Sequence, residues 1–274
     1  MDRINLDAVE RKENQGHIAK GNQPKWLLDG KWYKADHMGY EALAEVLTAF
    51  LLKQSNVSNF VAYEPVLIQN QGKKMPGCAS QNFRGKNEML VSFERLHRAY
   101  RGQGLAAALG EMNEPKQRIG YTVDFLEQTT GLSGVGEHLT LLLEADAFFL
   151  NEDRHTNNLS VIRNEQTKEF RLCPVFDHGL ALLADLKDYP MDQNVYDCMS
   201  RVRAKPFDVD FDVQVKAAQA LYGPQLKFSF TQSEILKRFD DLRELYSDAV
   251  LVRAEQILCE QMRKYPAYFC RGTM

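Results

Sequence analysis

The sequence predicts an α+β fold with two lobes, a β-rich N-lobe and a helical C-lobe. Three observations support this prediction. Short apolar runs separated by turn residues fill the chain up to about residue 95. Beyond that point, apolar residues recur at steps of three and four, as they do on the buried face of a helix. The 274 residues suffice for one large domain or for two small lobes around a cleft. We therefore expect an N-lobe over residues 1–95 and a C-lobe over residues 96–274.

The composition is that of an ordinary soluble globular protein. Hydrophobic residues make up 44% and charged residues 26% of the chain, and the net charge of −3 gives no general attraction to nucleic acid or membrane. The five cysteines form no CxxC pair, which favours reduced thiols over a disulfide framework or a zinc ribbon. The N-terminus has no apolar signal core, and no apolar run is long enough to cross a bilayer. We expect a cytoplasmic protein with no membrane insertion and no nucleic acid partner.

Strands and one helix are predicted for the N-lobe. After a loose leader, the turn pair Asp29-Gly30 separates two short apolar runs and predicts a β-hairpin over residues 26–34. Apolar residues at helical spacing predict a helix over residues 39–53. Two further strands, joined by the polar turn NQGKKMPG, are predicted over residues 61–69 and 78–83.

Helices dominate the predicted C-lobe. Helical periodicity covers residues 137–150 and 234–264, the latter in one or two pieces. Thr231 and Glu234 form a capping-box pattern at the start of the second stretch. The segment PFDVDFDVQV, residues 206–215, alternates apolar and acidic residues and predicts an extended edge segment. A strand pair is predicted over residues 159–163 and 170–176.

One polar stretch between apolar segments is rich in chemically useful side chains. NEDRHTNNLSVI, residues 151–162, contains Asp153 and Asn158, and Asp177 follows beyond the predicted strand pair. A hairpin brings its two ends together, so Asn158 and Asp177 can meet at one ion. Phosphoryl transfer uses such a set, because one carboxylate orients or deprotonates a hydroxyl while an amide oxygen and a second carboxylate hold Mg²⁺ against the phosphates.

A cation for those phosphates is expected in the N-lobe. Lys34 lies near the end of the second hairpin strand, Glu41 begins the following helix, and Glu45 lies one turn further. A strand lysine paired with a helix glutamate aims its ammonium at nucleotide phosphates. We prefer Glu41 as the partner and keep Glu45 as the alternative. The small loop of residues 21–23 is expected to cover the phosphates with backbone N–H groups.

Two plainer interpretations compete for the same residues. Asp and Asn cap turns in ordinary surface loops, which explains residues 153–158 taken alone. His155 beside Asp153 or Asp177 also suggests a metal hydrolase, but the chain has no HxH or HxxxH spacing. The ordered occurrence of Lys34, residues 153–158 and Asp177 favours phosphoryl transfer.

Six short motifs, in the same order, resemble those of the HipA-like kinases, which belong to the wider protein-kinase and phosphoinositide-kinase superfamily. They are GNQPK, WYKAD, YEALAEVL, CASQNF, NEDRHTNNLSVI and PVFDHG. In that family they correspond to the nucleotide loop, the strand lysine, the helix glutamate, the interlobe hinge, the catalytic loop and the metal site. The resemblance runs from about residue 21 to about residue 183, and the ordered set is more specific than any single motif.

The resemblance implies a bilobal kinase that uses ATP and Mg²⁺ to phosphorylate a serine or threonine of a protein substrate. It implies Asp153 as the catalytic base, Asn158 and Asp177 as Mg²⁺ ligands, and His155 as a brace of the catalytic loop. It also implies a set of nucleotide-binding residues: Lys34, Glu41, Gly21, Asn22, Gln23, Gln81, Asn82 and Phe83.

Departures from the family and rival activities limit this interpretation. Longer HipA-like toxins carry an N-terminal subdomain and a regulatory serine before the nucleotide loop, whereas NQGHIAKG holds no serine or threonine. An antitoxin-like partner, as in toxin–antitoxin pairs, is therefore a minor expectation. The D-R-H-x-x-N form is shared with phosphoinositide kinases and keeps a lipid or small-molecule kinase as an alternative, although the acidic segment of residues 180–196 favours a protein. A catalytically silent kinase-fold binding module is a further alternative.

Overall fold

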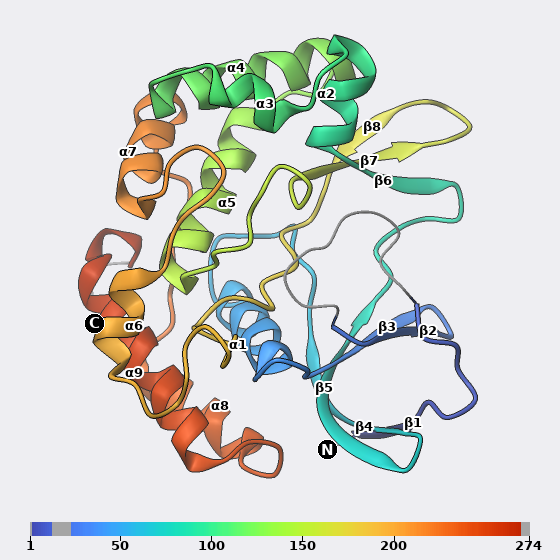
Figure 1. Cartoon of the computed structure of the whole chain (residues 1–274), viewed down its shortest axis with the longest axis vertical. Helices are drawn as coiled ribbons and strands as arrows, with labels where there is room; N and C mark the ends of the chain where they lie inside the picture. The colour runs from blue at the N-terminus through green and yellow to red at the C-terminus, as the bar shows by residue number, and fades with distance from the viewer. Residues whose placement is uncertain (1, 13–22, 270–274) are drawn as a thin grey trace.

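The computed structural model describes residues 2–12 and 23–269. The predicted α+β class is confirmed, with strands concentrated in the N-terminal region and helices in the remainder (Figure 1). The strands are β1 (Asp2–Asn5), β2 (Lys25–Leu28), β3 (Lys31–Ala35), β4 (Glu64–Asn70), β5 (Lys73–Gln81), β6 (Glu88–Ser92), β7 (Ser160–Asn164) and β8 (Phe170–Leu172). The α-helices are α1 (Glu41–Leu52), α2 (Phe93–Arg101), α3 (Leu105–Gly110), α4 (Pro115–Thr130), α5 (Val135–Phe149), α6 (Val195–Arg201), α7 (Phe211–Tyr222), α8 (Gln232–Leu242) and α9 (Asp248–Lys264). Within the described ranges, no helix combines the length and apolar character needed to cross a membrane.

The first sheet has five strands in the order β1-β4-β5-β3-β2. β2 and β3 form the predicted hairpin, and its turn residues Asp29 and Gly30 both have positive φ, 49° and 76°. β1 pairs in parallel with β4, with Asp2 opposite Val66. The prediction of a loose leader is therefore wrong for residues 2–5. A four-residue strand whose partner lies far along the chain leaves no local pattern to recognise.

The β4–β5 hairpin has a tighter turn than the sequence predicted. Its turn is Gln71-Gly72, with φ of 51° and 73°, so β5 begins at Lys73 and not at Cys78. The longer strand pairs with β4 on one side and β3 on the other, which makes it the centre of the sheet. Cys78 on β5 lies opposite Lys34 on β3, and this register fixes the position of Lys34 along the sheet relative to β5.

α1 packs against the five-stranded sheet and is buried on nearly every side. Figure 1 shows it between that sheet and the C-terminal helices. Its sequence, EALAEVLTAFLL, consists mostly of good helix formers. The Asp36 carboxylate accepts a hydrogen bond from the Ala42 N–H at 2.6 Å, which satisfies a donor that a helix start leaves unpaired. Because packing surrounds the helix, its carboxylates point in fixed directions.

Three further strands form a separate sheet in the order β6-β7-β8. β6 precedes residue 95 in the chain but pairs with β7, so the two sheets divide between Gln81 and Glu88. α5 is almost entirely buried and packs against α7. It ends at Phe149, with Leu150 in the left-handed region at φ 55°, and the polar stretch that follows connects it to β7.

One segment that the sequence predicts as extended contains a helix. The Asp210 carboxylate accepts hydrogen bonds from the N–H groups of Asp212 (2.8 Å) and Val213 (3.1 Å), and so caps the start of α7. The acidic alternation marks this helix start, where short acidic side chains satisfy free N–H groups. The buried positions of α7 follow a helical period: Phe211, Gln214, Val215 and Ala218.

The C-terminal region forms hydrogen bonds with the N-terminal region just after the end of α1. The predicted helical stretch is present in two pieces, α8 and α9, and the capping box of Thr231 and Glu234 is confirmed. Before α8, the Asn56 N–H donates to the Lys227 carbonyl and the Ser229 N–H donates to the Gln54 carbonyl, both at 2.9 Å. The end of α1 is thereby attached to the C-terminal region.

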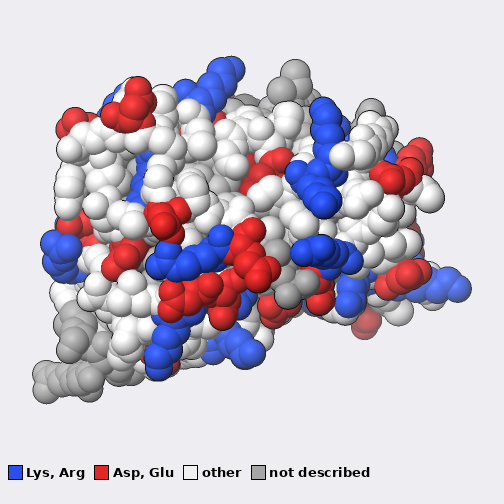
Figure 2. All heavy atoms as spheres, turned by 90° about the horizontal axis from the view of Figure 1, so that it is seen from below, with Lys and Arg blue, Asp and Glu red and all other residues white. Residues whose placement is uncertain are grey.

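Charges of both signs are interspersed on the face shown in Figure 2. Blue Lys and Arg side chains lie beside red Asp and Glu side chains, with uncharged surface between the groups. Among the described residues on this face, no continuous basic stripe is visible. This pattern agrees with the small net charge of −3.

Candidate active site

Lys34 lies at the centre of the candidate site, between two carboxylates from different parts of the chain. Its Nζ is 2.5 Å from Glu45 Oε1 on α1 and 2.9 Å from Asp177 Oδ1 in the loop after β8. The Tyr63 ring lies behind the ammonium, with its centroid 5.3 Å from Nζ. The side chain of Asp177 is 43% exposed, whereas that of Lys34 is 15% exposed. The cation is therefore enclosed, while the second carboxylate reaches solvent.

The preferred partner for Lys34, Glu41, is wrong in this structure, and the alternative, Glu45, is the partner. Glu41 accepts hydrogen bonds from the backbone N–H groups of the loop before α1, at 2.7 to 3.1 Å: His37, Met38 and Gly39. Those three donors hold its carboxylate at the helix start, one turn away from the lysine. Glu45 instead uses Oε1 for Lys34 and Oε2 for the His178 N–H at 2.9 Å. It therefore links the strand lysine to the Asp177 loop.

The charges of this group stabilise one another. Burial alone lowers the pKa of Lys34, but the carboxylates of Asp177 and Glu45 outweigh it and raise that pKa well above its usual value. The Lys34 ammonium in turn holds the pKa of Asp177 well below its usual range. At neutral pH the site therefore presents a fixed cation next to an ionised carboxylate.

The backbone at Asp177 is unusual and is held from both sides. Asp177 has φ of 65°, a left-handed conformation that a residue with a side chain rarely adopts. On one side, the Phe176 carbonyl accepts a hydrogen bond from Arg154 Nη1 at 3.2 Å. On the other side, the His178 N–H donates to Glu45. Strained backbone held in this way is concentrated at functional sites, because the strain aims one side chain.

Asp153 and Asn158 form the second half of the site. Asn158 Nδ2 donates to the Asp153 carbonyl at 2.7 Å and to Asp153 Oδ2 at 2.9 Å, which closes the loop between them. Burial, and then the nearby charge of Asp177, raise the pKa of Asp153 to about 6. A carboxylate with a pKa closer to neutrality is a better proton acceptor than an ordinary surface aspartate.

Arg154 braces both loops, and its role was not predicted. Its Nε and Nη2 reach the two oxygens of Asp146 on α5 at 2.8 and 3.0 Å, and both side chains are almost wholly buried. The same guanidinium contacts the Phe176 carbonyl and lies 3.2 Å from His178 Nε2. A carboxylate in the apolar helix LLLEADAFFL was the available signal, because a buried charge requires a partner.

His155, the predicted brace, forms hydrogen bonds and an ion pair only within its own loop, among the described residues. Its Nδ1 accepts a hydrogen bond from the Asn157 N–H at 3.2 Å, and its Nε2 lies 3.7 Å from Asp153 Oδ1. The ring is 30% exposed, unlike the buried Arg154. The bracing role expected of His155 therefore belongs to Arg154, and His155 lies beside the candidate base.

The predicted hinge residues lie at the end of β5 and directly after it. The Asn82 N–H donates to the Gly30 carbonyl at 2.8 Å, which ties the segment to the β2–β3 turn. The Phe83 ring lies 5.2 Å from the Phe176 ring, next to Asp177. Gln81 ends β5 and is exposed. The expected contacts of Gln81, Asn82 and Phe83 with adenine stay a prediction.

The segment predicted to be the nucleotide loop is described only in part. Gly21 and Asn22 lie outside the described residues. The Gln23 carboxamide lies over Gly179, where a β-carbon would be 3.7 Å from Gln23 Oε1. Gln23 therefore approaches the Asp177 loop from the N-terminal side, and its expected contact with phosphates stays a prediction.

Lys25 is a second cation of the site that the sequence analysis did not single out. It pairs with Lys34 across the β2–β3 hairpin. Burial lowers its pKa, while the charge of Asp177 acts in the opposite direction. The charge of Asp177 therefore reaches both strand lysines. The last position of the GNQPK motif was the available signal.

The donor set fits a magnesium ion that is held mainly by phosphates and water. Asn158 uses its amide nitrogen for Asp153, which leaves the amide oxygen as a donor, and Asp177 presents a partly exposed carboxylate. Within residues 2–12 and 23–269, no cluster of three or more His, Cys, Asp or Glu side chains could hold a metal alone. Mg²⁺ commonly takes one or two protein carboxylates and completes its shell with substrate phosphates and waters. Asn158 and Asp177 are suitable ligands of that kind.

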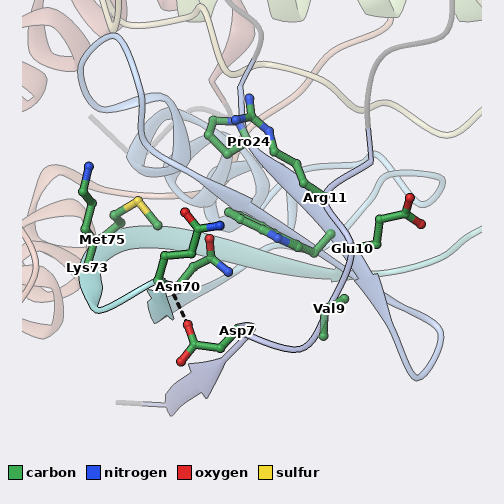
Figure 3. A pocket seen from close by; sticks show the side chains of 10 residues that line it. Asp7, Val9, Glu10, Arg11, Pro24, Asn70, Lys73 and Met75 are labelled. Carbon is green, nitrogen blue, oxygen red and sulfur yellow. Dashed lines mark hydrogen bonds between the residues drawn. The ribbon is translucent and has the colours of Figure 1, made fainter.

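A pocket of about 340 Å³ lies over the five-stranded sheet (Figure 3). Trp26 lines it, together with residues of the segment after β1 and of the β4–β5 turn. The Asp7 carboxylate at its rim accepts a hydrogen bond from the Gln71 N–H at 2.5 Å. None of the described candidate site residues lines this pocket, so its shape carries no information about the chemistry at Lys34.

Comparison with known proteins supports the fold. No protein-family model matches the chain, and no curated protein matches it in sequence. Among solved structures it is similar to a Helicobacter pylori proinflammatory kinase, CtkA, with a TM-score of 0.66 and 16% sequence identity over 97% of this chain and 96% of that one. A protein described as an aminoglycoside phosphotransferase, from Ralstonia eutropha, gives a TM-score of 0.27 at 13% identity over 95% and 92% of the two chains, which is too low to carry an argument. The similarity to CtkA along nearly the whole chain shows a protein-kinase-like fold.

Proposed function

We propose that this protein is an ATP- and Mg²⁺-dependent phosphotransferase, namely a HipA-like kinase that phosphorylates serine or threonine in a protein substrate. The observation that carries this proposal is the placement of Lys34 between Glu45 and Asp177. It sets a fixed cation beside a partly exposed carboxylate suited to Mg²⁺. The kinase-like fold and the order of the six motifs add support.

Each residue then has a definite task. Lys34 binds the nucleotide phosphates, and Glu45 keeps its ammonium aligned with the Asp177 loop. A bound Mg²⁺, with Asn158 and Asp177 as protein ligands, supplies charge neutralisation on the phosphates. Asp153 orients the acceptor hydroxyl and takes its proton as the new bond to phosphorus forms. With a pKa of about 6, Asp153 is mostly ionised at neutral pH.

A protein acceptor is preferred to a lipid or a small molecule. The segment after Asp177 contains three acidic residues, of which Asp185 is buried and accepts backbone hydrogen bonds from Lys187 and Asp188. Asp185 therefore has a structural role. Asp188 and Asp192 are exposed and give this surface an acidic character that suits a basic peptide better than an anionic lipid head group. The D-R-H-x-x-N form keeps the lipid or small-molecule acceptor as the second candidate.

The test is transfer of label from γ-labelled ATP with Mg²⁺ to the protein itself or to a general basic protein. Asp153→Ala and Asp177→Ala should abolish transfer, whereas Asp124→Ala, which removes an exposed carboxylate on α4, should not. No transfer by the unmodified protein, together with no Mg²⁺-dependent ATP binding, would overturn the proposal and favour a silent binding module. ATP binding without transfer to protein would move the acceptor to the lipid or small-molecule class.

A further inference from the structure

The segment of residues 182–192 is attached at its beginning to the loop before α1. The Tyr40 N–H donates to the Ala184 carbonyl at 3.2 Å, and the Tyr40 hydroxyl donates to the Leu182 carbonyl at 2.7 Å. A β-carbon on Gly39 would lie 2.0 Å from the Ala184 carbonyl oxygen, so the two backbones approach more closely than a side chain at position 39 would allow. The beginning of the segment therefore has a fixed position relative to α1.

The backbone at this end of the segment is strained. Leu182 and Leu183 have φ of 54° and 60°, a left-handed conformation that residues with a side chain seldom adopt. The Leu182 N–H donates to the Phe149 carbonyl at the end of α5, at 2.8 Å. Strained residues of this kind persist only where the surrounding structure holds them, and they are concentrated at functional sites. The tertiary structure therefore determines the course of this segment.

Further along, the segment is bonded to the loop that carries the candidate base. The Tyr189 hydroxyl donates to Glu152 Oε2 at 2.6 Å, and the two residues are only 6% and 9% exposed. Burial, and then this hydrogen bond, raise the pKa of Tyr189, so the hydroxyl keeps its proton and remains a donor. Glu152 directly precedes Asp153 in the chain. One buried hydrogen bond therefore connects the segment with the neighbour of the candidate base.

The C-terminal helices support Tyr189 from another direction. The guanidinium of Arg201, at the end of α6, lies 5.9 Å from the centroid of the Tyr189 ring. Arg253 on α9 is buried, and its Nη1 donates to the Pro190 carbonyl at 2.9 Å. These contacts hold the ring and the next residue, so the hydroxyl has one direction in which to reach Glu152. The hydrogen bond therefore fixes the position of this segment relative to the catalytic-loop candidates.

We propose that Tyr189 is a positioning residue that sets the place of a protein acceptor relative to Asp153 through its hydrogen bond to Glu152. This inference rests on the proposed phosphotransferase function, in which the exposed acidic side of the 182–192 segment receives a basic protein. An acceptor held on that side keeps its hydroxyl in line with the candidate base only while the segment and the catalytic-loop candidates stay in register. Orientation of the acceptor supplies much of the rate of phosphoryl transfer. A water molecule that attacks ATP does not depend on the segment.

The test compares Tyr189→Phe with Tyr265→Phe. Each substitution removes a hydroxyl that donates to a carboxylate at 2.6 Å, which is Glu152 for Tyr189 and Asp212 for Tyr265. Asp212 lies in the first turn of α7 and belongs to neither loop of the candidate site. Three quantities are measured for each variant: the Kd for ATP, the kcat/KM for transfer to a basic protein, and the rate of ATP hydrolysis with water as the acceptor. Melting temperatures establish that the variants are folded.

Tyr189→Phe should lower kcat/KM for protein transfer by about tenfold, while the Kd for ATP and the rate of hydrolysis stay unchanged. Tyr265→Phe should keep all three values. Equal losses of transfer and hydrolysis in Tyr189→Phe would overturn the inference, because they would show a general effect on the catalytic loop. Undiminished protein transfer by Tyr189→Phe would also overturn it and would leave the proposed function intact. An unmodified protein without transfer or hydrolysis would instead overturn the proposed function itself.

Discussion

Asp146 near the end of α5 and Arg154 in the following loop form a buried ion pair with two hydrogen bonds of 2.8 and 3.0 Å. Arg154 also contacts the Phe176 carbonyl and His178, on either side of Asp177. One guanidinium therefore connects the core helix with the loops that carry Asp153 and Asp177. Arginine suits this task because its planar fork of donors serves several acceptors at fixed angles.

Loss of Arg154 should destabilise the protein strongly. Arg154→Met leaves the Asp146 carboxylate buried without its partner, and the free energy of unfolding should fall by about 3–5 kcal/mol. Urea denaturation measures the change. The double variant Asp146→Leu with Arg154→Met should regain stability, because it buries no unpaired charge, but it should not regain phosphoryl transfer. A single variant as stable as the unmodified protein would contradict the bracing role.

The same pair predicts how stability responds to acid. Burial opposes the ionised form of Asp146, but the Arg154 guanidinium outweighs it and lowers the pKa to about 2 from the usual 3.8. A lowered pKa contributes stability that is present above the unfolded value and is lost as the pH falls through the folded value. Stability should therefore decline between pH 4 and pH 2, and Asp146→Asn should show a smaller slope there. Urea midpoints at several pH values give both slopes, and equal slopes would contradict the assignment.

Glu45 and Glu41 should respond differently to the same substitution. Glu45→Gln removes the charge that holds Lys34 and should lower kcat/KM by about 100-fold with little change in melting temperature. Glu41→Gln weakens the cap of three backbone N–H groups before α1 and should cost about 1 kcal/mol of stability while most activity remains. Steady-state kinetics and thermal unfolding of the two variants separate these effects. The reverse pattern would return the lysine partner to Glu41.

The features predicted correctly are those with a local cause. The Asp29-Gly30 turn and the Thr231 capping box each act within four residues, so the sequence alone is sufficient. The partner of Lys34 could not be predicted in this way, because Glu41 and Glu45 lie one turn apart on the same helix and both are buried. The loop before α1 supplies three donors to Glu41 and thereby leaves Glu45 for Lys34. That choice depends on a tertiary arrangement that no pattern within α1 contains.

The start of α7 shows a second limit of local patterns. The alternation of Asp208, Asp210 and Asp212 with apolar residues matches a strand period, but it ends where the helix begins. Asp208 accepts a hydrogen bond from the Asp210 N–H at 2.8 Å, and Asp210 caps the helix. Acidic residues at helix starts and at strand edges look alike over so few positions, and only the helical period of the following buried residues distinguishes them.

The pKa of Asp153 sets the expected pH dependence of transfer. Burial and the charge of Asp177 raise this pKa to about 6, and the ionised form accepts the hydroxyl proton. The kcat/KM should therefore rise with pH through about 6 and reach a plateau above it. Because kcat/KM reports the free enzyme, initial rates at low substrate concentration measure this limb directly. A limb near pH 4 would contradict this prediction, because it would show that the titrating carboxylate has no raised pKa.

A raised pKa also has a consequence for stability. The folded protein binds the Asp153 proton more tightly than the unfolded chain, in which the pKa of this carboxyl is near 3.8. The ionised carboxylate therefore destabilises the native state above about pH 6. Asp153→Asn removes this charge but keeps an oxygen that can accept the hydrogen bond from Asn158. The variant should be inactive, yet more stable at pH 8 on the order of 2 kcal/mol, with no gain at pH 4. Urea denaturation at the two pH values tests this difference. If the variant is less stable than the unmodified protein at both pH values, the loop depends on the charge of Asp153. The idea that this charge destabilises the native state would then be wrong.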